Sequence, residues 1–331
     1  MNLGRAQEIV GGFAGKRVLV LGDMMLDEYI WGSVSRISPE APVMVVDADY
    51  HTFVPGGAAN VVNNLCALGA RASIAGLVGQ DAAGLTLREK LLEEGADVTG
   101  LLVTPDRPTT QKTRILAHSQ QVVRVDHEKR DPIDEGSLAL LKTFLDNAIP
   151  QCDAVLLSDY KKGFLSKAVI AYAAELAGEK GKIITGNLKP SSLGGHCRLT
   201  MVTMNHFEAG EATGYLISGA PSEGTLHEAG RTLLRKTGAA HVLVTQREHG
   251  LTLFSPDTDP VHLPAHRVEV FDPAGAGDTT ISTLTLALAS GATAEEAVRL
   301  ANAAGAVVVK KVGVATLSPA ELLAMASAEE L

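Results

Sequence analysis

The sequence predicts an α/β protein in which helices cover both faces of a mostly parallel β-sheet. Short apolar runs of strand length alternate with amphipathic stretches of helix length along most of the 331 residues. The composition is 46% hydrophobic but only 4% aromatic, which suits helices that pack on a sheet through small side chains. Ligands of such sheets bind at the carboxyl ends of the strands, so functional side chains are expected just after the strands.

Six apolar runs and five amphipathic stretches carry this prediction. The strands are expected at Arg17–Leu21, Ala72–Val78, Ala154–Leu157, Lys182–Thr185, Met201–Thr203 and His241–Thr245. The helices are expected at Ala58–Leu68, Leu85–Glu94, Glu135–Asn147, Lys167–Ala177 and Thr225–Lys236. Several of these helices are followed by a glycine, such as Gly69 or Gly238, which is typical of a helix end.

Two regions break the alternation of strand and helix. Tyr29–Val34 with Val43–Tyr50, and Thr109–Ala117 with Gln121–Asp126, alternate polar and apolar residues without a helix between them. We interpret them as a small β lid, from about residues 28–50 and 109–126, that closes over the site from one side. The same pattern also fits an extension of one edge of the main sheet.

No internal repeat or linker-like tract divides the chain. Its length alone would allow one large domain or two. A single domain over residues 1–331 with an inserted β lid is the simplest organisation.

The formal net charge of −9 argues against a general nucleic-acid or anionic-membrane surface, because both need a basic face. Cys66, Cys152 and Cys197 lack the spacing of a disulfide framework or a thiolate metal site. The amino-terminal residues do not form a signal peptide, and no segment has the apolar length to span a bilayer. A cytoplasmic protein without nucleic-acid or membrane partners is expected.

A carboxylate late in the chain is the main catalytic candidate. Arg267–Phe271 is predicted to be a strand, Asp272–Gly277 a glycine-containing turn, and Asp278–Ala289 a helix. Asp278 would then lie at the helix start, where the helix dipole is expected to lower its pKa and keep it ionised. Phosphoryl transfer needs alignment of the acceptor hydroxyl more than a strong base, so an ionised and well-aimed aspartate would suffice.

The turn before Asp278 fits an anion site. Successive backbone amides of Gly275, Ala276 and Gly277, together with the positive end of the helix, would bind the oxygens of a transferred phosphoryl group. Gly275–Asp278 also fit an ordinary turn followed by a helix-capping aspartate.

Two further motifs accompany this turn. Gly56 and Gly57 enter a predicted helix and would let a polyol approach the backbone, while Asn60, one turn later, can bond to its hydroxyls. Asn205 and Glu208 follow a predicted strand and share one helical face, where the carboxylate could hold Mg²⁺ or its water shell. The plainer alternatives are a tight strand-to-helix turn and a capped helix start.

The three motifs follow one another along the chain as Gly56–Asn60, Asn205–Glu208 and Gly275–Asp278. In this order they resemble the ribokinase or PfkB family of carbohydrate kinases, and the resemblance covers nearly the whole chain. It implies a ribokinase-like three-layer α/β/α core with a mostly parallel sheet and a small β lid. It also implies an enzyme that transfers phosphate to an alcohol group, with ATP and Mg²⁺ as cofactors. Whether a monovalent cation is needed stays open.

The resemblance implies a role for each matching residue. Asp278 would be the base, and Gly275, Ala276 and Gly277 the anion hole. Sugar hydroxyls would be held by Asp27, Gly56, Gly57 and Asn60. The nucleotide would be contacted by Asn187, Asn205, His206, Phe207, Glu208, Asp272 and Asn302, with Glu208 also serving the metal.

Four sequence runs resemble one branch of the family, the monofunctional kinases that phosphorylate the anomeric hydroxyl of D-glycero-D-manno-heptose 7-phosphate on the way to ADP-heptose and the lipopolysaccharide core. They are Asp23–Asp27, Ser35–Val43, Lys112–Arg114 and Ser158–Tyr160. A sugar phosphate needs cations for its own phosphate. The candidates are Arg36, Lys112, Arg114, Arg124, Lys161 and Lys162, each of which also fits a solvated surface charge.

The unpaired edges of a β lid would be protected in a homodimer in which two lids pair.

The chain departs from the family pattern at three places. Gly186–Lys189 replaces an Asp-Pro-Lys run, and Met204 and Pro273 replace other residues of the pattern. A kinase for another sugar, sugar phosphate or nucleoside, or a non-catalytic sugar-phosphate sensor, fits the same motifs. A nicotinamide-dependent oxidoreductase is disfavoured because no Gly-x-Gly-x-x-Gly follows the first strand.

Overall fold

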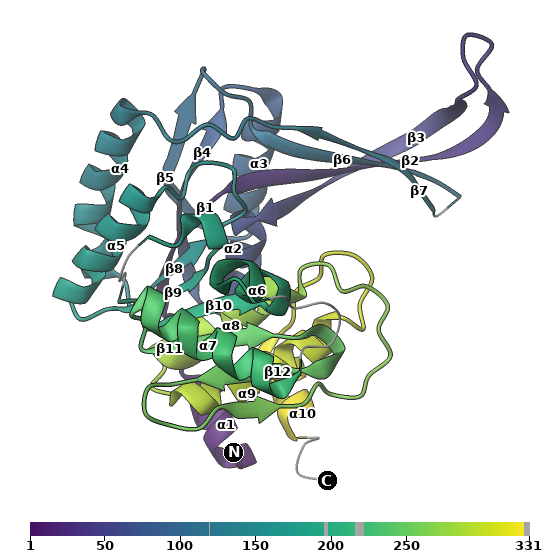
Figure 1. The fold of residues 1–331 in the computed structure, drawn as a ribbon. Helices are drawn as coiled ribbons and strands as arrows, with labels where there is room; N and C mark the ends of the chain where they lie inside the picture. The colour runs from purple at the N-terminus through teal and green to yellow at the C-terminus, as the bar shows by residue number, and fades with distance from the viewer. Residues whose placement is uncertain (119, 195–197, 216–221, 328–331) are drawn as a thin grey trace.

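The main β-sheet has nine strands, in the order β13-β12-β11-β10-β9-β8-β1-β4-β5 (Figure 1). The computed structural model describes residues 1–118, 120–194, 198–215 and 222–327. The strands are β1 (Arg17–Gly22), β4 (Arg71–Gly79), β5 (Asp97–Thr104), β8 (Ala154–Ser158), β9 (Ile183–Asn187), β10 (Met201–Asn205), β11 (His241–Thr245), β12 (Leu251–Phe254) and β13 (Val261–Leu263). Among the described strands of this sheet, only the pairs β11–β12 and β12–β13 are antiparallel, so the predicted mostly parallel sheet is confirmed.

Helices cover both faces of this sheet. They are α1 (Leu3–Gly11), α2 (Ala58–Ala67), α3 (Ala82–Glu93), α4 (Glu135–Ala148), α5 (Lys167–Glu179), α6 (His206–Thr213), α7 (Glu223–Thr237), α8 (Ala276–Ala289), α9 (Ala294–Val308) and α10 (Pro319–Ser327). Short 3₁₀ helices span Ile149–Gln151, Pro190–Ser192 and Arg247–His249.

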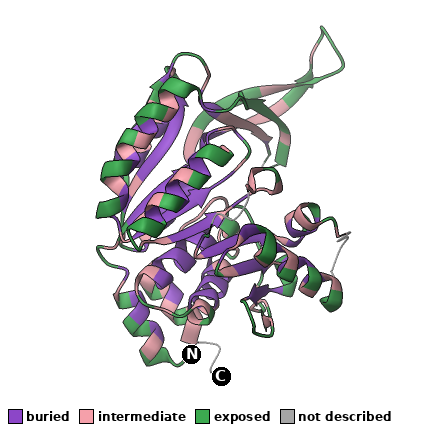
Figure 2. Ribbon diagram, turned by 60° about the vertical axis from the view of Figure 1, so that its left-hand side comes forward, coloured by how far each residue is buried: buried purple, intermediate pink, exposed green. Residues whose placement is uncertain are grey.

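Successive residues of β1 belong to two different hydrophobic cores. Val18 and Val20 pack with α1, α2, α8 and α9 on one face, whereas Leu19 and Leu21 pack with α4, α5 and α7 on the other. Side chains of a strand alternate between faces, and both faces of β1 are buried here. Figure 2 shows the inner sides of the helices buried and their outer sides exposed, as expected for a three-layer α/β/α core.

All six apolar runs predicted as strands of the main sheet and all five amphipathic stretches predicted as helices are present, with bounds shifted by a few residues. The predicted strand at Arg267–Phe271 is wrong. The amides of Phe271 and Asp272 instead donate to the carbonyl oxygen of Val309, at the end of α9, at 2.8 and 3.2 Å. The side chains of Val270 and Phe271, whose apolar character suggested a strand, are exposed.

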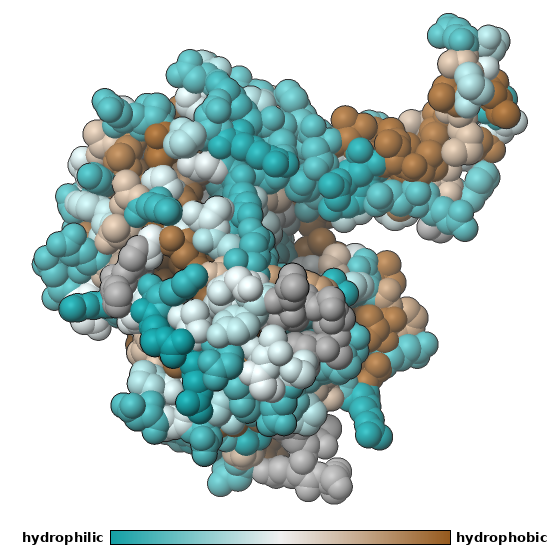
Figure 3. Space-filling model, viewed as in Figure 1, coloured by the Kyte–Doolittle hydropathy of each residue, from teal (hydrophilic) through white to brown (hydrophobic). Residues whose placement is uncertain are grey.

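The irregular β regions form a second sheet of four strands in the order β3-β2-β6-β7, separate from the main sheet. Its strands are β2 (Met24–Ile37), β3 (Met44–Gly57), β6 (Thr110–Ala117) and β7 (Gln120–His127). These four β-segments are therefore confirmed as strands, and the alternative of an extended edge of the main sheet is wrong. Figures 1 and 3 show this second sheet projecting from the core as an arm.

The base of the second sheet is joined directly to the core. Asp23 alone separates β1 from β2, and β3 runs straight into α2. The amide of Asp23 donates to the carbonyl oxygen of Ser158 at 3.2 Å, and the amide of Ala58 donates to that of Asp23 at 3.1 Å. The second sheet therefore begins at the carboxyl ends of β1 and β8, where ligands of α/β sheets bind.

Two observations bear on the expectations about membrane segments and cysteines. Across the described ranges, no helix combines the length and the apolar character needed to cross a bilayer. Cys66 and Cys152 are free thiols, while Cys197 lies outside the described residues.

Candidate active site

Three elements bring polar side chains to the carboxylate of Asp278. Asp278 lies in the first turn of α8, Asn60 in the first turn of α2, and Tyr160 in the loop after β8. Asn60 Nδ2 donates to Asp278 Oδ2 at 2.7 Å, and the hydroxyl of Tyr160 donates to Asp278 Oδ1. Asp278 is only 9% exposed, so both carboxylate oxygens are fixed in a largely dry environment.

The local environment raises the pKa of Asp278 to about 6. Burial is the main cause, and it outweighs the hydrogen bonds from Tyr160 and Asn60 and the charge of Lys189, all of which lower the pKa. The expectation of a pKa lowered by the helix dipole is therefore wrong. The carboxylate is still mostly ionised at pH 7, with a proton affinity closer to that of an effective general base.

The amino end of α8 differs slightly from the predicted turn. The helix begins at Ala276, and Gly275 is its N-cap with a φ of 78°. The amide of Ala276 donates to the carbonyl oxygen of Pro273 at 3.3 Å. Within the described part of the chain, the amide of Gly277 has no hydrogen-bond partner. Of the three amides expected to bind phosphoryl oxygens, that of Ala276 is thus already weakly engaged.

A buried polar network fixes the orientation of Asn60. Asn64 Nδ2 donates to the backbone oxygen of Asn60 at 2.9 Å and to its Oδ1 at 3.3 Å. Thr279 Oγ1, in α8, donates to Asn64 Oδ1 at 2.7 Å. Because Asn60 Oδ1 already accepts from Asn64, its amide nitrogen is the atom that faces Asp278.

The structure brings the residues expected to hold sugar hydroxyls next to Asp278. Asp27 in β2 is buried and pairs with Arg114 of β6, and its charge contributes to the raised pKa of Asp278. A Cβ atom on Gly56 would lie 2.3 Å from Asp27 Oδ2, so only glycine leaves room for that carboxylate. Gly57 has a φ of 57°, which favours glycine as well.

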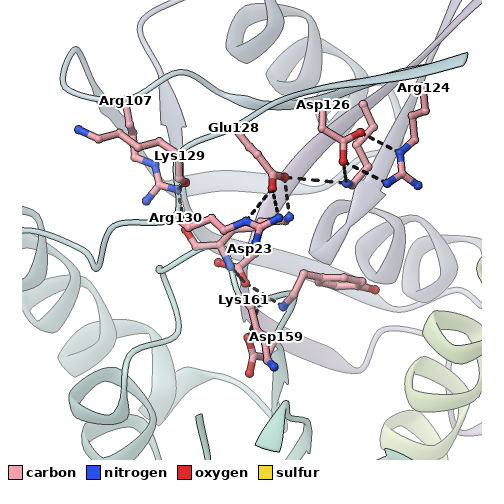
Figure 4. Close-up of polar contacts among 12 residues, drawn as sticks. Asp23, Arg107, Arg124, Asp126, Glu128, Lys129, Arg130, Asp159 and Lys161 are labelled. Carbon is pink, nitrogen blue, oxygen red and sulfur yellow. Dashed lines mark hydrogen bonds and ion pairs between the residues drawn. The ribbon is translucent and has the colours of Figure 1, made fainter. Parts of the chain in front are cut away.

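Most of the predicted phosphate-binding cations gather along β6, β7 and the loop after β8 (Figure 4). Lys162 Nζ lies 2.5 Å from Glu128 Oε2, and Lys112 Nζ lies 3.0 Å from Asp126 Oδ2. Arg124 Nε lies 2.8 Å from Asp126 Oδ1.

Glu128 is the centre of this group. Arg130 also pairs with Glu128, at 2.6 Å. Burial would raise the pKa of Glu128, but its bonds to Lys162 and Arg130 lower that pKa below its ordinary value. We call this group the charged cluster. It consists of four cations and two carboxylates, namely Lys112, Arg124, Arg130 and Lys162 with Asp126 and Glu128.

Three predicted cations are not part of the charged cluster. Arg114 pairs with Asp27 instead. Arg36 is nine residues beyond Asp27 along β2, a span of about 30 Å in an extended strand, and its exposed side chain is within 3.9 Å of Asp47. Arg36 and Asp278 of the same chain therefore cannot contact one small substrate, and grouping Arg36 with the other cations is wrong. Lys161 extends toward Glu211 of α6, at 3.7 Å.

Asn205 and Glu208 form a capping box at the start of α6, as the plainer alternative expected. Asn205 Oδ1 accepts from the amide of Glu208 at 2.9 Å, and Glu208 Oε2 accepts from the amide of Asn205 at 3.1 Å. Glu208 Oε1 lies 2.5 Å from Lys189 Nζ. His206 is buried, with Nδ1 3.3 Å from the carbonyl oxygen of Thr245. The ring of Phe207 is exposed, with the guanidinium of Arg247 5.2 Å from its centroid.

Three other residues that were expected to contact the nucleotide also form hydrogen bonds within the protein. Asp272 accepts from the amides of Ala274 and Gly313, at 2.9 and 3.2 Å. Asn302 Nδ2 donates to the carbonyl oxygen of Pro264 at 2.9 Å. Asn187 ends β9, and its carbonyl oxygen accepts from the amide of Asp159 at 3.0 Å. Nucleotide roles for these residues stay predictions.

The residues present are compatible with Mg²⁺ held mainly by a nucleotide. No three described His, Cys, Asp or Glu side chains are grouped so that they could hold a metal ion. Mg²⁺ usually keeps several waters and binds one or two carboxylates together with substrate phosphates. Glu208 is the carboxylate available on the nucleotide side, although both of its oxygens already have partners.

Sequence reasoning missed the central position of Asp23, Tyr160 and Lys189. Asp23 and Tyr160 follow β1 and β8, and Lys189 follows β9. The rule that ligands bind at the carboxyl ends of parallel strands points to all three. All three fell within sequence runs that were compared with the family, but none of them was assigned a role.

Comparison with known proteins identifies a family by sequence and a fold by structure. The family model described as "pfkB family carbohydrate kinase" matches residues 16–321. The bifunctional protein HldE of Desulfatibacillum aliphaticivorans is 45% identical over 94% of this chain and 63% of its own length. The bifunctional protein HldE of Caulobacter vibrioides is 44% identical over 96% of this chain and 65% of its length. The chain thus spans a little under two thirds of these relatives.

Solved structures share the fold at low sequence identity. Arabidopsis thaliana ribokinase, complexed with ribose and ATP, superimposes with a TM-score of 0.73 at 18% identity, over 94% of this chain and 99% of that one. Escherichia coli phosphofructokinase-2, in its tetrameric inhibited form, gives 0.78 at 17% identity, over 96% of this chain and 100% of that one. These likenesses show a ribokinase-like fold.

Proposed function

The chain belongs to the pfkB family of carbohydrate kinases, and on that basis we propose that it transfers the γ-phosphoryl group of ATP to the anomeric hydroxyl of D-glycero-D-manno-heptose 7-phosphate. The product, heptose 1,7-bisphosphate, would feed ADP-heptose and lipopolysaccharide core synthesis in the cytoplasm. The observation that carries the chemistry is the buried carboxylate of Asp278 at the amino end of α8, beside Asn60 and Asp27. The choice of sugar rests on the four sequence runs that resemble heptose 7-phosphate kinases.

In the proposed reaction Asp278 orients the anomeric hydroxyl and accepts its proton, as the hydroxyl oxygen bonds to the γ-phosphorus of ATP and the bond from that phosphorus to the ADP oxygen breaks. A pKa of about 6 lets the carboxylate be ionised at pH 7 and still take up a proton. The free amide of Gly277 and the helix dipole of α8 stabilise negative charge on the transferred group. Asp27, Gly56 and Asn60 hold the sugar ring in position.

When bound with ATP, Mg²⁺ supplies positive charge that offsets the charge of the phosphates. Glu208, through the metal's water shell, is the carboxylate of this chain expected to orient it. Lys189 lies between Glu208 and the ring of Tyr160, so its ammonium group can bind a phosphoryl oxygen on the nucleotide side.

The charged cluster is the proposed site for the 7-phosphate. It has four cations and two carboxylates, a local excess of about two positive charges that matches a phosphate of about −2. The cluster and Asp27 are adjacent because Asp27 pairs with Lys112 in the parallel register of β2 and β6. A sugar phosphate can therefore extend from Asp278 along the second sheet, which we expect to act as a lid.

Turnover by the purified chain with ATP, across a panel of acceptors, tests this proposal. We expect heptose 7-phosphate to exceed the unphosphorylated heptose in kcat/KM by at least roughly 100-fold, because the excess positive charge of the cluster would have no phosphate to bind. Fructose 6-phosphate, ribose and nucleosides are the comparison acceptors. A preference for any unphosphorylated sugar would refute the heptose phosphate assignment.

The charged cluster can be tested with a matched pair of lysine variants. Lys112→Met should raise KM for the sugar phosphate and leave KM for ATP unchanged. Lys167→Met, at an exposed position on α5, should change neither value. An unchanged KM in Lys112→Met would place the phosphate elsewhere.

A further inference from the structure

We propose that Tyr160 is a positioning residue of the transfer reaction, whose hydroxyl orients the Asp278 carboxylate and favours its ionised form. The inference rests on the proposed role of Asp278 as the base. Tyr160 lies in the loop after β8, and its hydroxyl donates to Asp278 Oδ1 while Asn60 donates to Oδ2. The two donors fix the plane of the carboxylate from opposite sides. An ionised carboxylate has about four acceptor positions, so positions remain beside these two donors for the acceptor hydroxyl.

Buried carboxylates hold the tyrosine loop by its backbone. Asp23 Oδ2 accepts from the amides of Tyr160 and Lys162, at 2.8 and 3.0 Å, and its Oδ1 accepts from the amide of Phe164 at 3.1 Å. Asp159 accepts from the amides of Lys161 and Lys189, both at 2.9 Å. The position of the Tyr160 ring is therefore determined by the loop and not by its contact with Asp278 alone.

The face of the Tyr160 ring contacts the nucleotide side of the proposed site. Lys189 Nζ lies 5.8 Å from the ring centroid, a cation–π geometry. The same ammonium pairs with Glu208. One tyrosine thus connects the carboxylate that meets the acceptor hydroxyl with the cation that faces the donor phosphates.

The tyrosine is suited to donate and not to act as a base itself. Burial and the neighbouring charge of Asp278 raise the pKa of Tyr160 well above its ordinary value. Its hydroxyl therefore keeps its proton over the working pH range. The other titratable groups that face Asp278 are Lys189 and Asp27, and Asp27 is paired with Arg114. Because the Tyr160 bond favours the ionised form of Asp278, removing it should raise the pKa of that carboxylate.

The test compares Tyr160→Phe with Tyr172→Phe. Tyr172 also donates to an aspartate, Asp146, but on the exposed surface. In Tyr160→Phe we expect kcat to fall roughly 10-fold, KM for the sugar phosphate to stay within about 2-fold, and the acid limb of the kcat profile to move up by about one pH unit. Tyr172→Phe should match the parent chain. An acid limb that does not move in Tyr160→Phe overturns the inference.

A double-variant cycle separates this inference from the proposed function. If Tyr160 acts through Asp278, Tyr160→Phe should lower the residual rate of Asp278→Asn by less than about 2-fold. An Asp278→Asn variant with full activity would reject the proposed base itself. A normal loss in Asp278→Asn, followed by a further 10-fold loss in the double variant, would reject only the link between Tyr160 and Asp278. Thermal unfolding of each variant checks that the fold is kept.

Discussion

At the scale of single residues, the proposed chemistry depends on one carboxylate, and the surroundings of this carboxylate shift its pKa in opposite directions. Burial raises the pKa of Asp278, and donors from α2 and from the β8 loop lower it. The sequence was enough to select Asp278 as the candidate base, because a glycine turn precedes its Thr-rich helix. It was not enough to predict the direction of the pKa shift, because burial depends on Tyr160 and Asn60, which are 118 and 218 residues away in sequence.

Replacing Asp278 by Asn should slow the chemical step by roughly 10²–10⁴-fold, the usual contribution of a general base. Sugar binding should be largely kept, because Asn has nearly the same shape and can still accept from one donor. Single-turnover rates and calorimetric binding of the sugar phosphate measure the two effects separately. Equal losses of binding and rate would indicate a misfolded site.

The same substitution should make the fold more stable at alkaline pH. The pKa of Asp278 is raised from 3.8 to about 6 in the folded protein, so its protonated form favours folding below pH 4, and this contribution is lost as the pH rises through 6. Asp278→Asn removes the cost of the buried charge, about 3 kcal/mol at pH 8. Urea unfolding should show this gain at pH 8 and a smaller one at pH 4.5. A gain that is equal at both values would contradict the assigned pKa.

At the scale of elements, strands and helices with strong periodicity were predictable, and the loops between them were not. Ala58–Leu68 and Asp278–Ala289 are apolar enough to be recognised, and they supply Asn60 and Asp278. Arg267–Phe271 has the composition of a strand, but the amide of Phe271, like that of Asp272, bonds to the carbonyl oxygen of Val309 at the end of α9. The β8 loop owes its shape to Asp23, a single residue between two strands. Local sequence does not encode such contacts.

Gly275 and Gly277 offer a matched test of the amino end of α8. Gly275 has a φ of 78°, and a Cβ there would lie 3.1 Å from Asn60 Nδ2, whereas Gly277 is helical with open space around its Cα. Gly275→Ala should destabilise the fold by about 1–2 kcal/mol. Gly277→Ala should stabilise it by about 0.5–1 kcal/mol through helix propensity. Urea midpoints measure both, and a stable Gly275→Ala would mean that α8 can begin in another way.

At the scale of the whole molecule, the second sheet gives the enzyme two distinct regions. Its base carries Asp27, Lys112 and Arg114 close to the core, and its far end carries Arg36 in solvent. The sequence predicted that the four strands exist but not how long β2 and β3 are, because strand patterns do not report length. For that reason Arg36 was grouped with cations that lie at the other end of the same sheet.

The exposed surface of the second sheet also predicts how two chains associate. Large apolar side chains on it are exposed, among them Ile37, Met44, Val123 and Val125 (Figure 3), and its edge strands β3 and β7 offer unpaired backbone groups. We expect a homodimer through this sheet.

Light scattering tests this expectation and should give twice the chain mass. Val125→Asp should shift the measured mass toward that of one chain, because a charge would be buried at the interface. Val103→Asp, at an equally exposed valine of β5 in the main sheet, should leave the dimer intact. A parent chain that is monomeric at micromolar concentration would show that the apolar surface has another role.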